Sequence, residues 1–138
     1  MKRKGLWIAI TVVLVVVIGV VVWQQQQPAP QEEKEIKIGA ILPLTGPASD
    51  IGQQTKEGLE IARKLLSVNV VYEDSKSEPK EGINAIRKLV LQHKKQLFGV
   101  ISVLSSVGKA IIPVAEDEKI ITLHISSAPG IVDKRKYA

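Results

Sequence analysis

Hydroxyl groups dominate the residues of this chain that could do chemistry. Ser105 and Ser106 form one pair, and Ser126 and Ser127 form a second pair after another apolar run. A hydroxyl donates one hydrogen bond and accepts two, so it can cap a helix or hold a polar ligand. For the first pair two interpretations stay open: capping of the following helix alone, or capping together with ligand contact.

Other polar residues favour structural roles over chemistry. Glu73 and Asp74 indicate a helix start or turn rather than a phospho-acceptor or metal site, and residues 45–47 are typical of a turn. We expect His93 to be a solvated residue near a helix end and His124 to fill space in an apolar strand rather than bind metal. The sequence holds no Gly-rich phosphate loop, nucleophile–base pair or metal-ligand cluster, so we expect no enzyme, cofactor or metal site.

Charge and cysteine content exclude several classes of protein. The chain has 138 residues, a formal net charge of +5 and no cysteine. Lys2, Arg3 and Lys4 carry three of the excess positive charges, and the other cations are scattered among acids. Because nucleic-acid binding needs a basic face, we expect none. Without cysteine there is no disulfide, thiolate metal site or lipid-modified Cys. Residues 94–95 and 134–136 are expected as solvated surface.

The first 34 residues predict attachment to a membrane. The run between Leu6 and Trp23 carries no charge, and its Val, Ile and Leu residues each favour the bilayer by roughly 0.3–0.6 kcal/mol. Trp7 and Trp23 would stand about 24 Å apart on a helix, near the two interfaces of the hydrocarbon layer. Residues 1–5 are then a cytoplasmic basic stub, 6–23 one transmembrane helix and 24–34 a linker.

The alternative for this segment is a cleaved signal peptide, whose apolar core is usually shorter, about 7–15 residues. The uncleaved anchor is favoured, which predicts a single-pass protein of the cell membrane. Cleavage would give a secreted or periplasmic protein instead. Both interpretations place the soluble domain outside the cytoplasm.

From residue 35 to 138 the pattern alternates between strand and helix. It predicts strands at 36–42, 68–72, 98–103 and 120–125, and helices at 52–66, 77–93 and 106–116. This alternation implies the α/β class, a parallel sheet with helices on both faces joined by right-handed crossovers. Ligands of such sheets bind beyond the carboxyl ends of the strands. That rule selects four loops, at 43–52, 74–78, 104–106 and 126–130.

Spacings of three and four residues predict which side of each helix faces the sheet. The predicted inward residues are Leu59, Ala62, Leu65 and Leu66 in the first helix, Ile83, Ile86, Leu89 and Val90 in the second, and Val107, Ala110, Ile111 and Val114 in the third.

Four stretches occur in a specific order and at specific spacings. They are residues 39–47 followed by Gly52, Gly58 and Ala62, then 70–79, then 101–106, then 113–116. Together they resemble the type I periplasmic binding proteins, and most closely the leucine/isoleucine/valine-binding family. The resemblance runs from about residue 35 to 137. It implies that residues 35–138 form an incomplete first lobe of a two-lobed solute-binding domain.

The resemblance also implies a ligand site. Members of the family hold the ligand carboxylate in the first lobe with hydroxyls and N–H groups at helix starts, where the helix dipole favours an anion. Ile51 stands where several members place an aromatic residue over the ligand. The matching positions are Ser105, Ser106, Ser126, Ser127, Ala128 and Ile51.

By the same resemblance, the expected function is that of the extracytoplasmic solute-binding component of an ABC importer. The implied ligand is an amino acid or a similar small carboxylate, and the implied partners are ABC permease subunits. Two alternatives stay open: the ligand-binding sensor domain of a membrane receptor, and a truncated fragment that binds nothing.

Overall fold

The computed structural model describes residues 36–131, 133, 136 and 137. The predicted stub, anchor and linker at 1–34 lie outside these residues. In the part that is described, no helix combines the length and the apolar character needed to cross a bilayer. The chain divides into two units, Met1–Glu33 and Lys34–Ala138, and the fold below is that of the second unit.

Strands and helices alternate through this unit as the sequence predicts, and their ends differ from the predicted ones by at most three residues. The elements are β1 (Lys37–Leu42), α2 (Ser49–Leu66), β2 (Asn69–Asp74), α3 (Pro79–His93), β3 (Leu97–Val103), α4 (Ser105–Glu118) and β4 (Ile121–Ile125). All strand pairs are parallel, and the strand order is β2-β1-β3-β4. The α/β class is confirmed.

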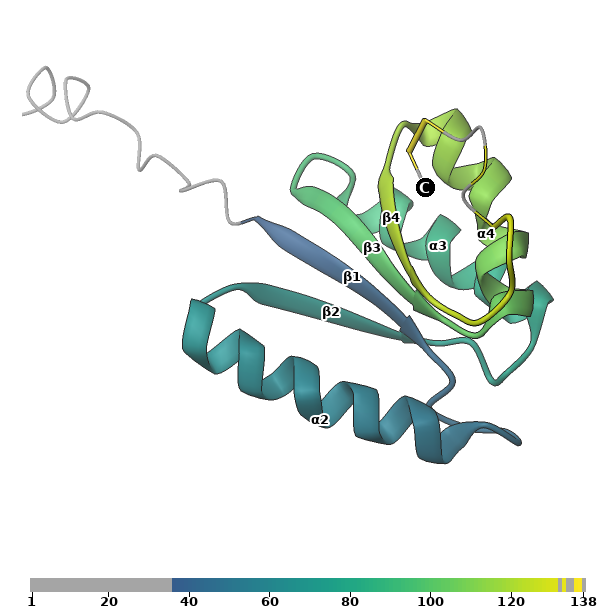
Figure 1. Cartoon of the computed structure of the whole chain (residues 1–138). Coiled ribbons are helices and arrows are strands. Elements are labelled where there is room, and N and C mark those ends of the chain that lie inside the picture. Colours follow the sequence, from purple (N-terminus) through teal and green to yellow (C-terminus); the bar gives the residue numbers. More distant parts are fainter. Residues whose placement is uncertain (1–35, 132, 134–135, 138) are drawn as a thin grey trace, which may run out of the picture. The chain divides into compact units, whose positions relative to one another are not determined.

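The helices cover both faces of the sheet. Figure 1 shows α2 on one face and α3 with α4 on the other. From β1 the chain passes through α2 to β2, which lies on one side of β1. From β2 it passes through α3 to β3, which lies on the other side of β1. Because parallel crossovers are right-handed, this reversal of direction puts the helices on opposite faces. The direction changes between β1 and β3, which is the point where open α/β sheets place their ligands.

Two hydrophobic clusters hold these layers together, and β1 contributes to both. Successive strand residues point to opposite faces. Ile41 joins the cluster under α3 and α4, whereas Ala40 and Leu42 join the cluster on the α2 side. All three side chains are fully buried. The central strand is therefore apolar on both faces, as parallel sheets require.

The predicted inward face of α2 is wrong at its last turn. Leu65 and Leu66 are 78% and 69% exposed, and Gly52 in the first turn is the buried residue of this helix. Leu59 does pack against the sheet. Helical spacing identifies which side of a helix is apolar, but it does not show how much of that side packs against the sheet.

The predicted faces of α3 and α4 are confirmed in their centres. Ile86, Leu89, Val107 and Ile111 are fully buried, and Val90 and Val114 pack against the same cluster. Ile83 and Ala110 are only half-buried. The prediction missed Ile112 and Ala115, because α4 packs against both α3 and β4 and so buries a wider side than one stripe.

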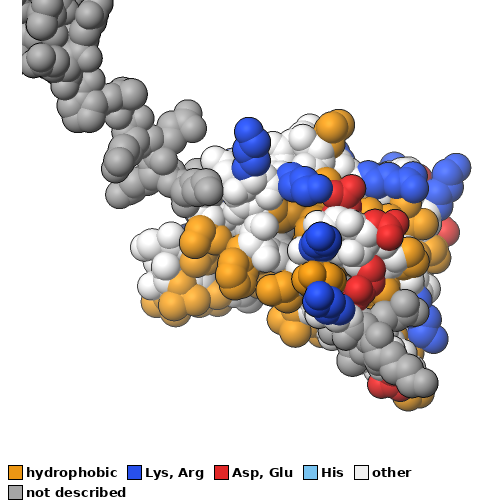
Figure 2. All heavy atoms as spheres, turned by 90° about the horizontal axis from the view of Figure 1, so that it is seen from above, with side chains coloured by type: hydrophobic (Ala, Val, Ile, Leu, Met, Phe, Trp, Pro, Cys, Tyr) orange, Lys and Arg blue, Asp and Glu red, His pale blue; other side chains and the backbone are white. Residues whose placement is uncertain are grey.

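One apolar surface stays open on the sheet. Residues of β4 that point away from α4 are exposed, because α2 packs on β1 and β2. These residues are Ile121, Leu123 and Ile125. Figure 2 shows hydrophobic side chains at the surface close to Lys and Arg side chains on the face drawn there.

Candidate functional site

The four loops selected from the sequence lie at the same end of the sheet. Leu42, the last residue of β1, pairs with Asp74, the last residue of β2. In the same way Val103 at the end of β3 pairs with Ile125 at the end of β4. We name this the carboxyl end of the sheet. Each helix begins there, directly after a strand or its loop. The carboxyl end therefore combines strand-end loops with helix N-termini, whose N–H groups have no partner within the helix.

Two of the predicted site segments are in direct contact. The backbone N–H of Ala128 donates to the Ser105 hydroxyl, with 3.2 Å between nitrogen and oxygen. This bond joins the start of α4 to the loop after β4. Ser126 and Ser127 are exposed in that loop, and Ser106 is exposed beside Ser105. Because Ser105 accepts this bond, its O–H can still donate to another group.

The predicted capping of α4 by serine is wrong. The helix starts at Ser105 itself, and no side chain caps its N-terminus. Leu104 occupies the N-cap position with φ 76° and ψ 130°. This backbone conformation is rare for a residue with a side chain. It turns the chain so sharply that Ser105 enters the first turn and directs its hydroxyl to the β4 loop instead of to the N–H groups of its own helix.

The electrostatics at the three helix starts differ. Asp50 lies in the first turn of α2 and Glu81 in the first turn of α3, whereas the first turn of α4 holds no acidic residue. A helix N-terminus carries about half a positive charge, which nearby carboxylates offset. Of these three helix starts, the one beside Ser105 therefore keeps the most favourable potential for an anion.

Ile51 lies at the carboxyl end but on a different helix from Ser105. It is in the first turn of α2 and is 51% exposed. The strands that lead into the two helices, β1 and β3, are neighbours. Ile51 and Ser105 therefore flank the point at which the direction of the chain changes.

Asp74 ties together the loops after β1 and β2. One carboxylate oxygen accepts the N–H groups of Leu44, Thr45 and Lys76 at 2.9, 3.2 and 2.8 Å, and the other accepts the Thr45 hydroxyl at 2.6 Å. Partial burial alone would raise the pKa of Asp74, but the Thr45 hydroxyl and these N–H donors together hold that pKa below its ordinary value. The predicted turn role is confirmed for Asp74 and residues 45–47, whereas Glu73 lies within β2 and pairs with Lys88 at 2.8 Å.

Close backbone contacts reinforce the same loops. A Cβ atom on Gly52 would lie 2.1 Å from the Pro43 carbonyl oxygen. A Cβ atom on Gly46 would lie 2.5 Å from the Lys76 carbonyl oxygen, and Gly46 also has a φ of +88°. Both positions need glycine, because a side chain at position 52 would push α2 away from the loop after β1, and one at position 46 would push the loops after β1 and β2 apart.

His124 belongs to a chain of hydrogen bonds that the sequence did not predict. Its Nδ1 lies 2.7 Å from the Ser102 hydroxyl, and its Nε2 lies 2.9 Å from the Thr122 hydroxyl. Thr122 in turn donates to the Tyr137 carbonyl oxygen. With the Thr122 hydrogen used there, Nε2 must carry the imidazole proton and Nδ1 must accept from Ser102.

This chain of hydrogen bonds has a structural role. Ser102 is only 1% exposed, so no substrate can reach its hydroxyl. Burial holds the pKa of His124 below its ordinary value, which favours the neutral imidazole that the hydrogen bonds require. The expectation that His124 only fills space is therefore incomplete, because its ring links β3, β4 and the C-terminal residues.

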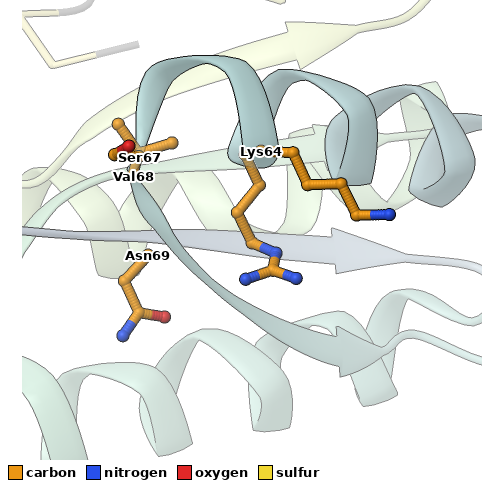
Figure 3. Close-up of a pocket in the computed structure, with 5 residues that line it drawn as sticks. Lys64, Ser67, Val68 and Asn69 are labelled. Carbon is orange, nitrogen blue, oxygen red and sulfur yellow. The ribbon is translucent and has the colours of Figure 1, made fainter.

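A pocket of about 380 Å³ lies at the opposite end of the sheet (Figure 3). It is lined by Arg63, Lys64, Ser67, Val68 and Asn69, where α2 ends and β2 begins. None of the predicted site residues lines it. The hydroxyls and helix N-termini described above converge elsewhere, so this pocket is separate from the candidate ligand site.

Comparison with protein families gives a match over almost all of the second unit. Residues 35–136 match the model of a family described as periplasmic binding protein. Among curated relatives, the chain is 32% identical over 77 residues to the Leu/Ile/Val-binding protein homolog 3 of Brucella melitensis. It is 42% identical over 71 residues to the Leu/Ile/Val-binding protein BraC3 of Rhizobium johnstonii.

These two matches cover 49% and 45% of this chain but only 21% and 19% of the relatives, so the chain spans about a fifth of their length. A solved structure, the leucine binding protein LivK of Thermotoga maritima, superposes with a TM-score of 0.66 at 32% identity. That superposition covers 74% of this chain and 31% of the Thermotoga protein. The described unit therefore has the fold of the first lobe of such proteins.

Proposed function

This chain belongs to the periplasmic binding protein family, and on that premise we propose that it supplies the first lobe of an amino-acid receptor for an ABC importer. Its relatives are named for binding leucine, isoleucine and valine, or leucine. The proposed ligand is therefore an aliphatic amino acid held by its carboxylate. Because the chain spans about a fifth of its curated relatives, we propose this lobe as one wall of a cleft.

The contact between Ala128 and Ser105 carries this proposal. It joins the β4 loop to the start of α4 at a distance of 3.2 Å. A carboxylate placed there would meet helix N–H donors, the Ser105 O–H and the exposed hydroxyls of Ser126 and Ser127. Anions are favoured at such a helix start by the free N–H groups and by the dipole together.

Backbone strain at the same place supports a binding role. Leu104 has φ 76°, in a region that side chains disfavour. Such conformations cost about 1–3 kcal/mol and are concentrated at ligand sites. Here the strain directs Ser105 toward Ala128 and leaves the α4 start without a side-chain cap, so the N–H donors stay available for a ligand.

Ile51 supplies the apolar part of the proposed site. Its half-exposed side chain at the start of α2 offers a surface for an aliphatic ligand side chain, in place of the aromatic residue of other members. Ser106 is the second hydroxyl of the α4 start. These roles, together with extracytoplasmic placement, an anchor at residues 6–23 and docking to permease subunits, are parts of the same proposal.

Titration of the isotope-labelled chain with L-leucine tests the carboxylate site. We expect NMR shifts at the amides of Ser105, Ser106 and Ala128 with a millimolar dissociation constant, on the order of −4 kcal/mol, because one lobe leaves much of the ligand in water. The matched ligand is 3-methylbutylamine, which is leucine without its carboxylate. It should shift none of these amides.

Ser105→Ala should weaken leucine binding several-fold, whereas Ser67→Ala, at the opposite end of the sheet, should leave it unchanged. Equal shifts by leucine and 3-methylbutylamine would contradict the proposal that this site binds the ligand carboxylate. Failure of every amino acid tested to shift these amides would argue against an amino-acid receptor.

A further inference from the structure

The two ends of the sheet differ in charge. The amino end, where strands begin and helices finish, is basic: Lys37, Arg63, Lys64, Lys94, Lys95 and Lys119 lie in the last helical turns, the turns after them or the first strand positions. The acids in the same positions are Glu116, Asp117 and Glu118, and Glu118 pairs with Lys94. An excess of positive charge therefore faces outward at this end.

Large apolar side chains are exposed at the same amino end. Most of the exposed large hydrophobic residues of the described unit lie there rather than at the carboxyl end. They include Ile36, Leu65, Leu66, Leu91, Phe98 and Ile121. Apolar residues mixed with cations are typical of surfaces that sit at the boundary of an anionic bilayer.

The pocket in Figure 3 belongs to this amino end. Arg63 and Lys64 line it together with the polar residues Ser67 and Asn69. Arg63 also pairs with Glu60 at 2.9 Å, which leaves its other guanidinium N–H groups to donate. A phosphate group could therefore be held by Arg63 and Lys64 at the mouth of this pocket.

The chain enters the fold at this end. β1 begins at Lys37, so the sequence that precedes it joins the unit beside these basic and apolar residues. Only 13 residues separate Lys37 from Trp23, the end of the uncharged run. An extended chain of that length spans at most about 45 Å, and a flexible one far less. If residues 6–23 are the anchor predicted from the sequence, the amino end is held close to the bilayer.

We propose that the amino end of the sheet docks on anionic phospholipid headgroups beside the anchor. Lys64, Lys95 and the other cations contact the phosphates, Leu65, Leu66 and Leu91 enter the headgroup layer, and the carboxyl end makes no contact with lipid. The inference rests on the predicted anchor and is independent of the ligand. A bilayer fits better than nucleic acid, because a phosphate backbone offers no apolar phase for these leucines.

Fluorescence quenching on the full chain tests this orientation. Because the chain has no cysteine, single thiols can be introduced at two matched positions, Gln92→Cys in the last turn of α3 and Gln54→Cys near the start of α2. Each variant carries a thiol-linked fluorophore and is reconstituted into vesicles that contain a headgroup-linked quencher. The vesicles are either phosphatidylcholine alone or phosphatidylcholine with phosphatidylglycerol.

We expect quenching at position 92 to increase at least twofold when phosphatidylglycerol is present and to fall again at 1 M salt, where charge interactions are screened over about 3 Å. Quenching at position 54 should stay low in both lipids. Equal quenching at the two positions, or quenching at position 92 that ignores anionic lipid, would overturn the proposal.

A charge-matched pair of variants sharpens the test. Lys64→Gln with Lys95→Gln removes two cations from the amino end, whereas Lys80→Gln with Lys109→Gln removes two exposed cations from the first two turns of α3 and α4. The first pair should abolish the increase caused by phosphatidylglycerol at position 92, and the second pair should preserve it. The same loss in both pairs would indicate an effect of net charge alone and would contradict a docking surface.

Discussion

The carboxyl and amino ends of the sheet are built from the same seven elements and have opposite characters. At the carboxyl end, Asp74, Ser77 and Ser105 cross-link loops through hydrogen bonds between residues far apart in the sequence. At the amino end, the long-range polar contacts include the exposed ion pair between Lys94 and Glu118 and the N–H bonds of Lys136 and Tyr137 to the Glu116 carboxylate. One end is cross-linked by hydroxyls and a carboxylate, whereas the other is basic and apolar.

This difference follows from the direction of parallel elements. Every helix presents its N–H groups at the carboxyl end and its carbonyl groups at the amino end. Anions and hydroxyl oxygens are therefore favoured at the first, and Lys and Arg at the second. The backbone approaches that exclude a side chain at Gly46 and Gly52 lie at the carboxyl end. The amino end exposes apolar and basic side chains, which could contact a bilayer as proposed above.

The largest effect should come from filling the close contact at the carboxyl end. Gly52→Ala would place a Cβ 2.1 Å from the Pro43 carbonyl oxygen, whereas Gly58→Ala on the same helix meets nothing within 4 Å. We expect Gly52→Ala to lower the free energy of unfolding by about 3 kcal/mol. Gly58→Ala should raise it by up to about 1 kcal/mol. Urea denaturation measures both, and equal stabilisation would show that this end is not tightly packed.

Removal of the Asp74 carboxylate should have the next largest effect. Asp74→Ala leaves three N–H groups and one hydroxyl without their acceptor. The group is partly exposed, so we expect a loss of about 2 kcal/mol in the free energy of unfolding. Asp117→Ala, an exposed acid at the amino end, should change it by less than about 0.5 kcal/mol. Chemical denaturation compares the two, and similar values would contradict the difference between the ends.

Acidification should weaken the β4 region through His124. Burial lowers its folded pKa below the ordinary 6.5, so the unfolded state takes up a proton first as the pH falls. Its contribution to stability is complete above pH 6.5 and is lost as the pH falls through the folded pKa. Ser102, Thr122 and Gly108 surround the ring, and none carries a charge that would rescue the imidazolium.

Thermal unfolding between pH 5 and 7 measures this slope. His124→Gln removes the titrating group, so its stability should depend less on pH over this range than that of the unaltered chain. A variant with the same slope would assign the pH dependence to other groups.

The smallest effect is expected at the amino end. Leu66→Ser removes an apolar side chain that is already exposed, so the free energy of unfolding should change by less than about 0.5 kcal/mol. Leu89→Ala, in the buried core under α3, should cost about 2–5 kcal/mol and calibrates the measurement. A large loss for Leu66→Ser would show that the last turn of α2 is packed after all.

Much of the fold could be predicted because local patterns repeat along the chain. Apolar runs and helical spacings gave the order and type of every described element, and parallel topology then placed the four loops together. The buried side of α3 and α4 also followed from spacing, as Ile86 and Ile111 illustrate. The site was predicted as a set of loops, with Ser105 and Ala128 among them. Their roles toward a ligand stay predictions.

The amino-acid sequence by itself determined which elements form, in what order, and at which end of the sheet hydroxyls gather, because these depend on local periodicity and on the direction of parallel strands. Only the tertiary structure decided that Ser105 bonds Ala128 instead of capping α4, that Asp74 joins two loops, and that Leu65 and Leu66 are exposed. Such contacts depend on strand register, helix placement and a positive φ at Leu104, which arise between segments and leave no local pattern.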